Sequence, residues 1–227
     1  MAKNFLESEG YSIVKSWLGE KGFEPFGFQL ETWEKFGKNY SGMVIAPTGF
    51  GKTYSVFLAV ITDFLNNPDN YKDGLQLLWI TPLRALAKDI AKAMTEAIDE
   101  IGLDWKVAVR NGDTPQAERV SQTKKMPEIL IITPESLQLL LAQKNNHRFF
   151  KNLKCVAVDE WHELLGSKRG VLVELALSQI ISYQKKLKIW GITATIGNLD
   201  EAMQVLIPYP KKKTKVVAKE KKKIDII

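Results

Sequence analysis

One loop of this chain has the composition of a site that binds phosphate. Residues 46–53 read APTGFGKT, follow the apolar run Met43–Ile45 and precede a stretch that favours a helix. Glycines let backbone N–H groups turn toward a polyphosphate, and a helix that begins directly after the loop adds the positive end of its dipole. In such a loop Lys52 would contact the β- and γ-phosphates, and the Thr53 hydroxyl would bind Mg²⁺. Ala46 stands where the strict pattern has glycine, so an ordinary glycine-containing turn is the alternative at this point.

Two adjacent carboxylates lie at the end of a predicted strand. The apolar run Cys155–Val158 leads directly to Asp159 and Glu160. Carboxylates at the end of a buried strand are costly unless a cation or a reaction requires them. In a phosphate-binding fold, we expect the first to hold Mg²⁺ and the second to activate the attacking water. An acidic strand end that opens into a loop explains these residues alone, but together with Lys52 and Thr53 they predict an ATPase.

Four further polar segments begin where predicted strands end. They read TPLR at 81–84, RNGDT at 110–114, TPES at 133–136 and TAT at 193–195. In an open α/β sheet, ligands bind outside the carboxyl ends of the strands, where hydroxyl and backbone N–H groups suit phosphate contacts. Threonine, serine and proline also begin helices, so each segment alone is more simply explained as a helix cap. Their placement at one edge of a single sheet favours a shared ligand.

The elements that must position these residues alternate along the chain. Two helical patterns, Tyr11–Gly22 and Phe28–Phe36, come first. The predicted strands are Met43–Ile45, Leu75–Ile80, Val107–Val109, Glu128–Ile132, Cys155–Val158 and Leu187–Ile192. The predicted helices among them follow Lys52, span Arg84–Ile101, surround Glu118, and span Glu135–Leu141, Val171–Tyr183 and Asp200–Val205. Such alternation predicts an α/β fold, with a mostly parallel sheet and helices on both faces.

Composition restricts the class of protein. The chain has 227 residues, of which 45% are hydrophobic and 26% charged, as in a globular protein with one large α/β domain. No apolar run approaches the roughly 20 residues that a membrane span requires, and the N-terminal residues lack the hydrophobic region of a secretory signal. The single cysteine, Cys155, cannot form an internal disulfide. These features predict a cytoplasmic protein that does not associate with membranes.

The positive charge is concentrated near the C-terminus. The net charge is +6, and residues 211–223, KKKTKVVAKEKKK, carry eight lysines and one glutamate, or +7, so that the rest of the chain carries −1. A lysine cluster can contact nucleic acid, but it is more often a solvated tail or linker. We therefore predict that residues 209–227 form a basic connector.

In their order and spacing, these motifs resemble the first motor domain of superfamily 2 helicases of the DExH-box kind. APTGFGKT resembles motif I of that family, TPLRAL motif Ia, RNGDT the segment often called Ic, ITPESL motif Ib, VDEWH motif II and TAT motif III. Phe28-Gln29 within PFGFQLETW resembles the Q motif, and Thr193 keeps the hydroxyl where motif III usually has serine. RNGDT, ITPESLQLLL and DEWHELLGSKRG together are most similar to the Lhr group, and within it to the bacterial ligase-associated DEXH-box helicases.

The resemblance implies a RecA-like P-loop domain with defined nucleotide contacts. Gln29 would read the adenine edge, which suits the paired donor and acceptor of its amide. Asp159 would hold Mg²⁺, largely through water, and Glu160 would be the catalytic base. The residues that would hold the triphosphate and Mg²⁺ are Gly49, Gly51, Lys52 and Thr53. We expect one of Phe23, Phe26 and Phe28 to stack on adenine, and the sequence leaves open which one.

The resemblance also implies coupling and nucleic-acid contacts. His162 would couple the ATP site to a facing domain, and Thr193 and Thr195 would link hydrolysis to strand movement. The residues that would line the path of a single strand are Arg84, Gly112, Asp113, Thr114, Thr133 and Pro134. The expected partner is single-stranded or partly duplex nucleic acid, with DNA favoured by the subgroup.

The same family predicts the organisation of a longer protein. Residues 1–208 would be the N-terminal ATP-binding domain, and residues 209–227 would lead to a second RecA-like domain that supplies arginine fingers. The chain alone would then bind ATP weakly and hydrolyse it very poorly. The subgroup also predicts a role in DNA repair and association with a DNA ligase or nuclease. An RNA-directed DExH ATPase and a non-catalytic, nucleotide-dependent docking module are the alternatives.

Overall fold

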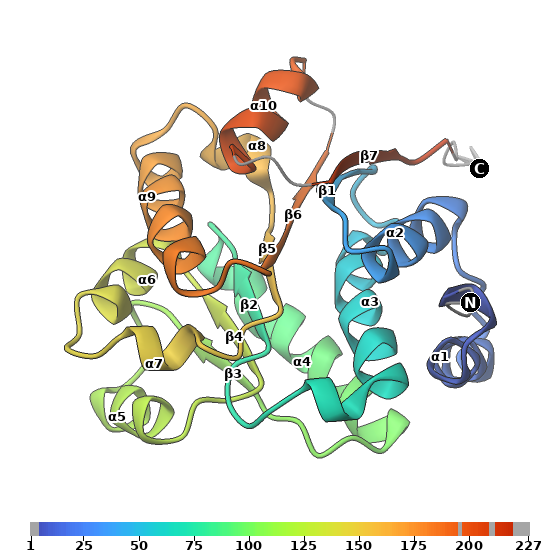
Figure 1. The fold of residues 1–227 in the computed structure, drawn as a ribbon, viewed down its shortest axis with the longest axis horizontal. Coiled ribbons are helices and arrows are strands. Elements are labelled where there is room, and N and C mark those ends of the chain that lie inside the picture. Colours follow the sequence, from blue (N-terminus) through green and yellow to red (C-terminus); the bar gives the residue numbers. More distant parts are fainter. Residues whose placement is uncertain (1–4, 195–196, 209–211, 220–227) are drawn as a thin grey trace, which may run out of the picture.

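A sheet of parallel strands forms the centre of the structure (Figure 1). The computed structural model describes residues 5–194, 197–208 and 212–219, and within them seven strands form one sheet. Every strand pairing is parallel. In order across the sheet, the strands are β3 (Val107–Arg110), β4 (Ile129–Ile132), β2 (Leu77–Ile80), β5 (Cys155–Val158), β6 (Lys188–Thr193), β1 (Ser41–Ile45) and β7 (Lys213–Val217). The predicted α/β fold is confirmed, and all carboxyl ends lie at one edge.

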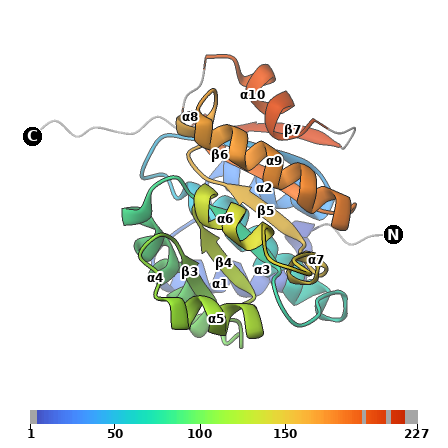
Figure 2. The ribbon, with the colours of Figure 1, turned by 90° about the vertical axis from the view of Figure 1, so that its left-hand side faces the viewer.

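Helices cover both faces of the sheet (Figures 1 and 2). One face packs against α3 (Lys52–Asn66) and α4 (Arg84–Ile101), and α1 (Glu9–Glu20) and α2 (Gly27–Gly37) pack against α3. The other face packs against α6 (Pro134–Leu141), α7 (His147–Phe150), α8 (Trp161–Leu164), α9 (Lys168–Tyr183) and α10 (Leu199–Leu206). The remaining elements are α5 (Gln116–Lys124), which follows β3, and two short 3₁₀ turns at Phe5–Glu7 and Pro68–Asn70. No helix among the described residues combines the length and apolar character needed to cross a membrane.

The two faces explain why the central strands are apolar throughout. Successive side chains of a strand point to opposite faces, and in β2 Leu77 and Trp79 join the core under α3 and α4, whereas Leu78 and Ile80 join the core under α6 to α10. Because both faces are covered, all four side chains are buried.

The predicted boundaries differ from the structure mainly where elements are short. The six predicted strands are present, although β1 begins earlier, at Ser41, and β2 begins later, at Leu77. The helix predicted from Val171 begins at Lys168. The four-residue helices α7 and α8 were not predicted, because one turn is too short to display a helical period.

The segment predicted to be a basic connector contains a seventh strand. Within 209–227, β7 pairs with β1 from Ser41–Lys213 to Ile45–Val217. Val216 is fully buried, whereas Lys213 and Lys215 are partly exposed, and Lys215 forms an ion pair with Asp200. Because β7 pairs with β1, this part of the lysine cluster belongs to the sheet. On an edge strand, lysines also oppose pairing with other chains. Whether the segment connects to a second domain stays a prediction.

The close approach of β7 to β1 predicts a stability effect at Gly42. A Cβ added to Gly42 would collide with the carbonyl oxygen of Thr214 and would lie 3.0 Å from the ring of Trp190. We expect Gly42→Ala to lower the free energy of unfolding by about 1–3 kcal/mol in urea denaturation, because neither neighbour can move freely. The control is Gly19→Ala in α1, where an added Cβ meets nothing within 4 Å and should be neutral or stabilising by about 0.5–1 kcal/mol. Equal stability of the two variants would contradict the β1–β7 pairing.

Candidate functional site

The predicted phosphate loop connects β1 to α3 at the carboxyl edge of the sheet. Gly49 has φ +88° and Gly51 has φ +69°, a left-handed conformation that glycine adopts without a Cβ clash. Gly51 is the N-cap of α3, and no side chain caps this end of the helix. The Tyr54 N–H donates to the carbonyl oxygen of Gly51 at 3.1 Å. The N–H groups of Lys52 and Thr53, in contrast, lie in the first turn, at the end of the helix that attracts anions. That this loop binds a polyphosphate stays a prediction.

Gln29 reaches this loop from α2. Its side-chain nitrogen donates a hydrogen bond to the carbonyl oxygen of Gly51 at 3.0 Å, and its side-chain oxygen accepts one from the Phe26 N–H at 2.9 Å. The residue is 5% exposed. Gln29 therefore ties the start of α2 to the loop, and its amide keeps one further donor and acceptor position for a base edge.

The structure narrows the choice of aromatic side chain for adenine. Phe28 is only 2% exposed and lies in the core. Phe26 packs against Phe28 and Phe50, with ring centroids 5.8 and 5.5 Å away, and is 39% exposed. Phe23 is 62% exposed. A base can thus reach Phe26 or Phe23 but not Phe28, and Phe26 adjoins Gln29 directly through the hydrogen bond of its N–H.

The phosphate loop and the acidic pair converge in space. The Lys52 ammonium lies 3.5 Å from Glu160 Oε1, although the two residues are 108 positions apart in the chain. Their strands are not neighbours, because β6 lies between β1 and β5 in the sheet. Lys52 is 7% exposed and Asp159 is 6% exposed. Three charged groups therefore share one nearly buried position at the sheet edge.

The electrostatics of Asp159 fit a bound cation. Burial raises the pKa of the Asp159 carboxyl to about 6, and the charge of Glu160 adds to the rise. The Glu160 N–H, which donates to Asp159 Oδ1 at 3.0 Å, and the charge of Lys52 oppose the rise. Among the described residues, no cluster of three or more histidine, cysteine, aspartate or glutamate side chains could enclose a metal by itself. Mg²⁺ suits this position, because it keeps several waters and binds through one or two protein oxygens plus phosphate.

Glu160 has a strained backbone conformation and a buried carboxylate oxygen without a hydrogen bond. Its backbone has φ +46° and ψ +47°, a left-handed conformation that costs a residue with a side chain roughly 1–2 kcal/mol. Its Oε2 atom is buried without a hydrogen bond, and His162 Nδ1 lies 3.4 Å away. Backbone strain and an unsatisfied buried acceptor are both typical of functional sites.

His162 connects this site to the next strand. Its Nδ1 lies 3.1 Å from the hydroxyl of Thr193, which is fully buried at the end of β6. The same Nδ1 atom therefore lies near both Glu160 and Thr193. Thr195 lies outside the described residues.

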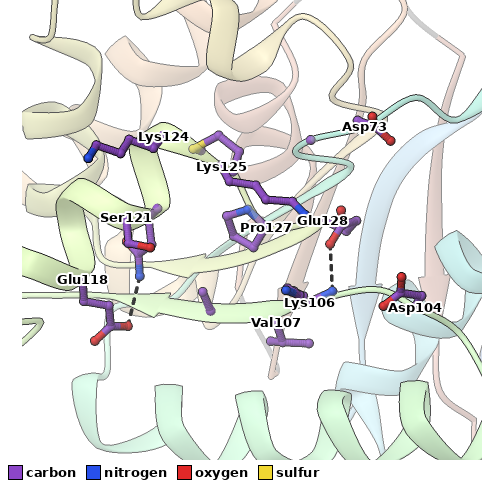
Figure 3. A pocket seen from close by; sticks show the side chains of 14 residues that line it. Asp73, Asp104, Lys106, Val107, Glu118, Ser121, Lys124, Lys125, Pro127 and Glu128 are labelled. Atoms are coloured by element: carbon purple, nitrogen blue, oxygen red, sulfur yellow. Dashed lines mark hydrogen bonds between the residues drawn. The ribbon is translucent and has the colours of Figure 1, made fainter.

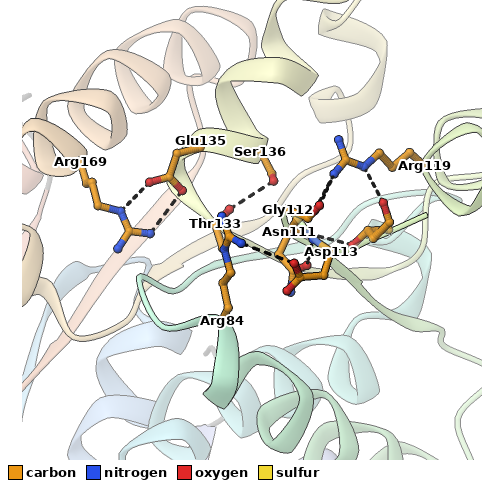
Figure 4. Close-up of polar contacts among 10 residues, drawn as sticks. Arg84, Asn111, Gly112, Asp113, Arg119, Thr133, Glu135, Ser136 and Arg169 are labelled. Carbon is orange, nitrogen blue, oxygen red and sulfur yellow. Dashed lines mark hydrogen bonds and ion pairs between the residues drawn. The ribbon is translucent and has the colours of Figure 1, made fainter. Parts of the chain in front are cut away.

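The residues predicted to line a nucleic-acid path fall into two groups by their exposure, and Figure 4 labels Arg84, Gly112, Asp113 and Thr133 among them. Arg84, Gly112 and Asp113 are exposed together: Arg84 Nη1 is 3.5 Å from Asp113 Oδ1, and a Cβ on Gly112 would lie 2.8 Å from the Arg84 guanidinium. The Thr114 hydroxyl accepts a hydrogen bond from the Asn111 N–H at 2.9 Å and shapes the same loop.

Thr133 and Pro134 form the second group and are both buried. The Thr133 hydroxyl lies 3.2 Å from the Ser136 hydroxyl at the start of α6. In this structure the two residues define the local backbone and present no side-chain surface. Their contact with a strand stays a prediction.

Three residues near these loops were not predicted to have a role. Arg119 donates hydrogen bonds to the carbonyl oxygens of Thr114, Asn111 and Gly112, at 2.9, 2.8 and 3.1 Å. Glu135 and Arg169 form an ion pair between α6 and α9 (Figure 4). The only signal in the sequence is their position in or beside the TPES, RNGDT and SKRG segments, since nothing local shows which groups they contact.

A separate cavity lies away from these residues. It has a volume of about 690 Å³ and opens beside the amino ends of β3 and β4 (Figure 3). Its lining includes both basic and acidic side chains, among them Lys106, Lys125, Asp104 and Glu118. It shares no residue with the phosphate loop or the acidic pair, so it is not the candidate nucleotide site.

Comparison with known proteins gives consistent matches. A family model described as DEAD/DEAH box helicase matches residues 27–202. The ATP-dependent helicase Lhr-Core of Methanothermobacter thermautotrophicus is 31% identical over 220 residues, which cover 90% of this chain and 26% of that protein. The chain thus spans about a quarter of the length of such a relative.

Solved structures agree with this comparison. The DUF1998 helicase MrfA, in a crystal structure bound to DNA and AMPPNP, superposes with a TM-score of 0.79 at 26% identity, covering 92% of this chain and 29% of that one. The Mycobacterium smegmatis helicase Lhr, in a structure bound to ssDNA and AMP-PNP, superposes with a TM-score of 0.77 at 28% identity, covering 94% of this chain and 28% of that one.

Proposed function

This chain belongs to the DEAD/DEAH box helicase family, and from its site we propose that it is the ATP-binding first motor domain of an Lhr-type, ATP-dependent DNA helicase or translocase. One observation carries the proposal: Lys52 of the phosphate loop lies 3.5 Å from Glu160 of the acidic pair, at the carboxyl edge of a RecA-like sheet. The residues proposed to bind phosphate and the residue proposed to activate water would therefore form one site.

Each residue has a role in this proposal. The loop from Gly49 to Lys52 would surround the triphosphate. Thr53 and Asp159 would hold Mg²⁺, which when bound neutralises the charge of the phosphate oxygens. Glu160 would take the proton of the attacking water, and the absence of a hydrogen bond to its buried Oε2, which lies 3.4 Å from His162 Nδ1, supports this role.

Three further residues would recognise the base and transmit the state of the site. Gln29 would contact the adenine edge while it holds the carbonyl oxygen of Gly51. His162 would couple a change in the position of Glu160 to Thr193, because its Nδ1 lies near both residues.

We propose DNA as the nucleic acid. The neighbouring MrfA and Lhr structures are described as bound to DNA and to ssDNA, which supports this choice. The exposed group of Arg84, Gly112 and Asp113 offers a guanidinium and a loop backbone that suit phosphate contacts. Such contacts do not distinguish DNA from RNA, because discrimination requires a 2′-hydroxyl contact. An RNA-directed ATPase is therefore the second candidate.

We also propose a longer protein around this domain. Relatives that are about four times its length support further domains, and the resemblance to superfamily 2 helicases implies that one of them is a second RecA-like domain. Because β7 is part of the sheet, the first domain would extend to Val217 rather than to residue 208. A cytoplasmic role in DNA repair, with a ligase or nuclease partner, is proposed from the subgroup resemblance alone.

The test is the ATPase rate of the full-length protein with matched single-stranded DNA and RNA of one sequence. We expect DNA to stimulate turnover more strongly than RNA at every concentration. Stronger stimulation by RNA would favour the second candidate. An absence of turnover with either polymer, despite ATP binding, would favour the non-catalytic docking module.

A further inference from the structure

An ion pair connects the first turns of α6 and α9 (Figure 4). Arg169 Nε donates to Glu135 Oε1 at 2.6 Å, and Arg169 Nη2 donates to Oε2 at 3.3 Å. Such a two-point contact fixes direction as well as distance. Burial acts to raise the pKa of Glu135, but the hydrogen bond from Arg169 and further hydrogen bonds outweigh it, and the pKa lies below its usual value. Glu135 is therefore ionised at neutral pH.

On one side, this pair holds the loop that is predicted to meet nucleic acid. Glu135 directly follows Thr133 and Pro134 in the first turn of α6. One turn later, the Gln138 side chain donates to the carbonyl oxygen of Leu172 in α9 at 2.8 Å. The start of α6 is thus attached to α9 at two points, and the position of the 133–134 loop depends on α9.

On the other side, the pair connects to the acidic motif. The helix α8 begins directly after Glu160, and α9 follows through a tight turn. The Ser167 hydroxyl donates to the carbonyl oxygen of Leu164 at 2.6 Å and accepts from the Gly170 N–H at 3.1 Å. A Cβ on Gly170 would collide with the carbonyl oxygen of Leu164, so the first turn of α9 lies directly against α8. A displacement at Glu160 would therefore move Arg169.

We infer that Arg169 and Glu135 are positioning residues that couple the nucleotide site to the nucleic-acid loop. The inference rests on the proposed function, since it concerns how that site responds to its two ligands. Nucleotide at Glu160 would shift α8 and the start of α9, and the ion pair would carry the shift to Thr133 and Pro134. Neither residue needs to touch nucleotide or nucleic acid.

The coupling is measurable as a ratio of affinities. The dissociation constant of a single-stranded DNA oligonucleotide is determined for the full-length protein with and without AMP-PNP. We expect Arg169→Ala to move this ratio toward one by about 2- to 30-fold, while the affinity for DNA alone and for AMP-PNP alone changes by less than about twofold. By linkage, the effect of DNA on AMP-PNP affinity must fall by the same factor.

Two further variants separate coupling from damage to the fold. The exchange of both charges, Arg169→Glu with Glu135→Arg, should restore much of the ratio that either single change removes. Lys21→Ala is the matched control, because the Lys21–Glu100 pair has the same side-chain exposure of 37% and 44% and joins the C-cap of α1 to α4. It should leave the ratio unchanged.

The outcomes distinguish this inference from the proposed function. If the unmodified protein binds neither AMP-PNP nor DNA, the proposed function is wrong. If it binds both, and the ratio is one or is unaffected by Arg169→Ala, the coupling inference is wrong and the function stands. A loss of both individual affinities with the ratio preserved would show direct contact or local unfolding, and would also overturn the inference.

Discussion

Replacing Glu160 with glutamine should lower the rate of ATP turnover of the full-length protein by about 10²–10⁴-fold. The amide keeps the shape of the side chain but cannot take a proton from water. The left-handed backbone at this residue is unchanged by the substitution, so the fold should be retained. ATP binding should stay within a few-fold, since the phosphate loop and Lys52 are intact. Turnover and binding are measured separately, by phosphate release under saturating ATP and by titration with a fluorescent nucleotide.

The control for this prediction is Glu163→Gln. Glu163 lies in α8, which begins directly after Glu160, and also contacts His162, with Oε1 3.4 Å from Nε2, but its side chain is 60% exposed. Its turnover should match that of the unmodified protein within about twofold. If Glu160→Gln retains full turnover, the catalytic assignment is wrong and the docking module becomes the better description.

Replacing Lys52 with alanine should have the second largest effect, a loss of about 10²–10³-fold in turnover together with weaker ATP binding. Lys52 is nearly buried beside Asp159 and Glu160, and its charge partly compensates theirs. Its removal leaves two carboxylates without that compensation and removes the cation that would contact the phosphates. Because the defect affects both steps, it differs from that of Glu160→Gln, in which binding is preserved.

A matched lysine controls for the loss of a buried ion pair as such. Lys188 lies 3.2 Å from Asp63 Oδ2, and the two side chains are 12% and 19% exposed. Lys188→Ala should lower the free energy of unfolding, as removal of one partner from a buried pair does, without changing turnover per folded molecule. An equal loss of turnover in both lysine variants would mean that Lys52 acts through stability alone.

The local order of residues was sufficient for the chemistry that lies within one loop or one strand end. The phosphate loop is recognisable from a strand, two glycines, Lys52, Thr53 and a helix in succession, because each of these requires only its neighbours. The parallel sheet is likewise predictable, since apolar runs alternating with amphipathic segments have few other ways to bury their surfaces.

Contacts between distant segments were decided by the tertiary structure. β7 consists largely of lysine and valine, so its sequence alone resembles a linker. Only its hydrogen bonding to β1 identifies it as a strand. Phe28 cannot be separated from Phe26 by residue type, and only packing buries one of the two. The same holds for Arg169 and Glu135, whose helices are adjacent because both pack on one face of the sheet.

The sequence by itself therefore determined which reactive groups this protein has and at which edge of the sheet they lie. The tertiary structure decided which of them face each other: Lys52 with Glu160, Glu160 with His162, and His162 with Thr193. The physical reason is that covalent bonding along the chain fixes the relative positions only of residues that are a few positions apart in the sequence. The distance between loops from different strands depends instead on the order of the strands and on the packing of the helices that cover them.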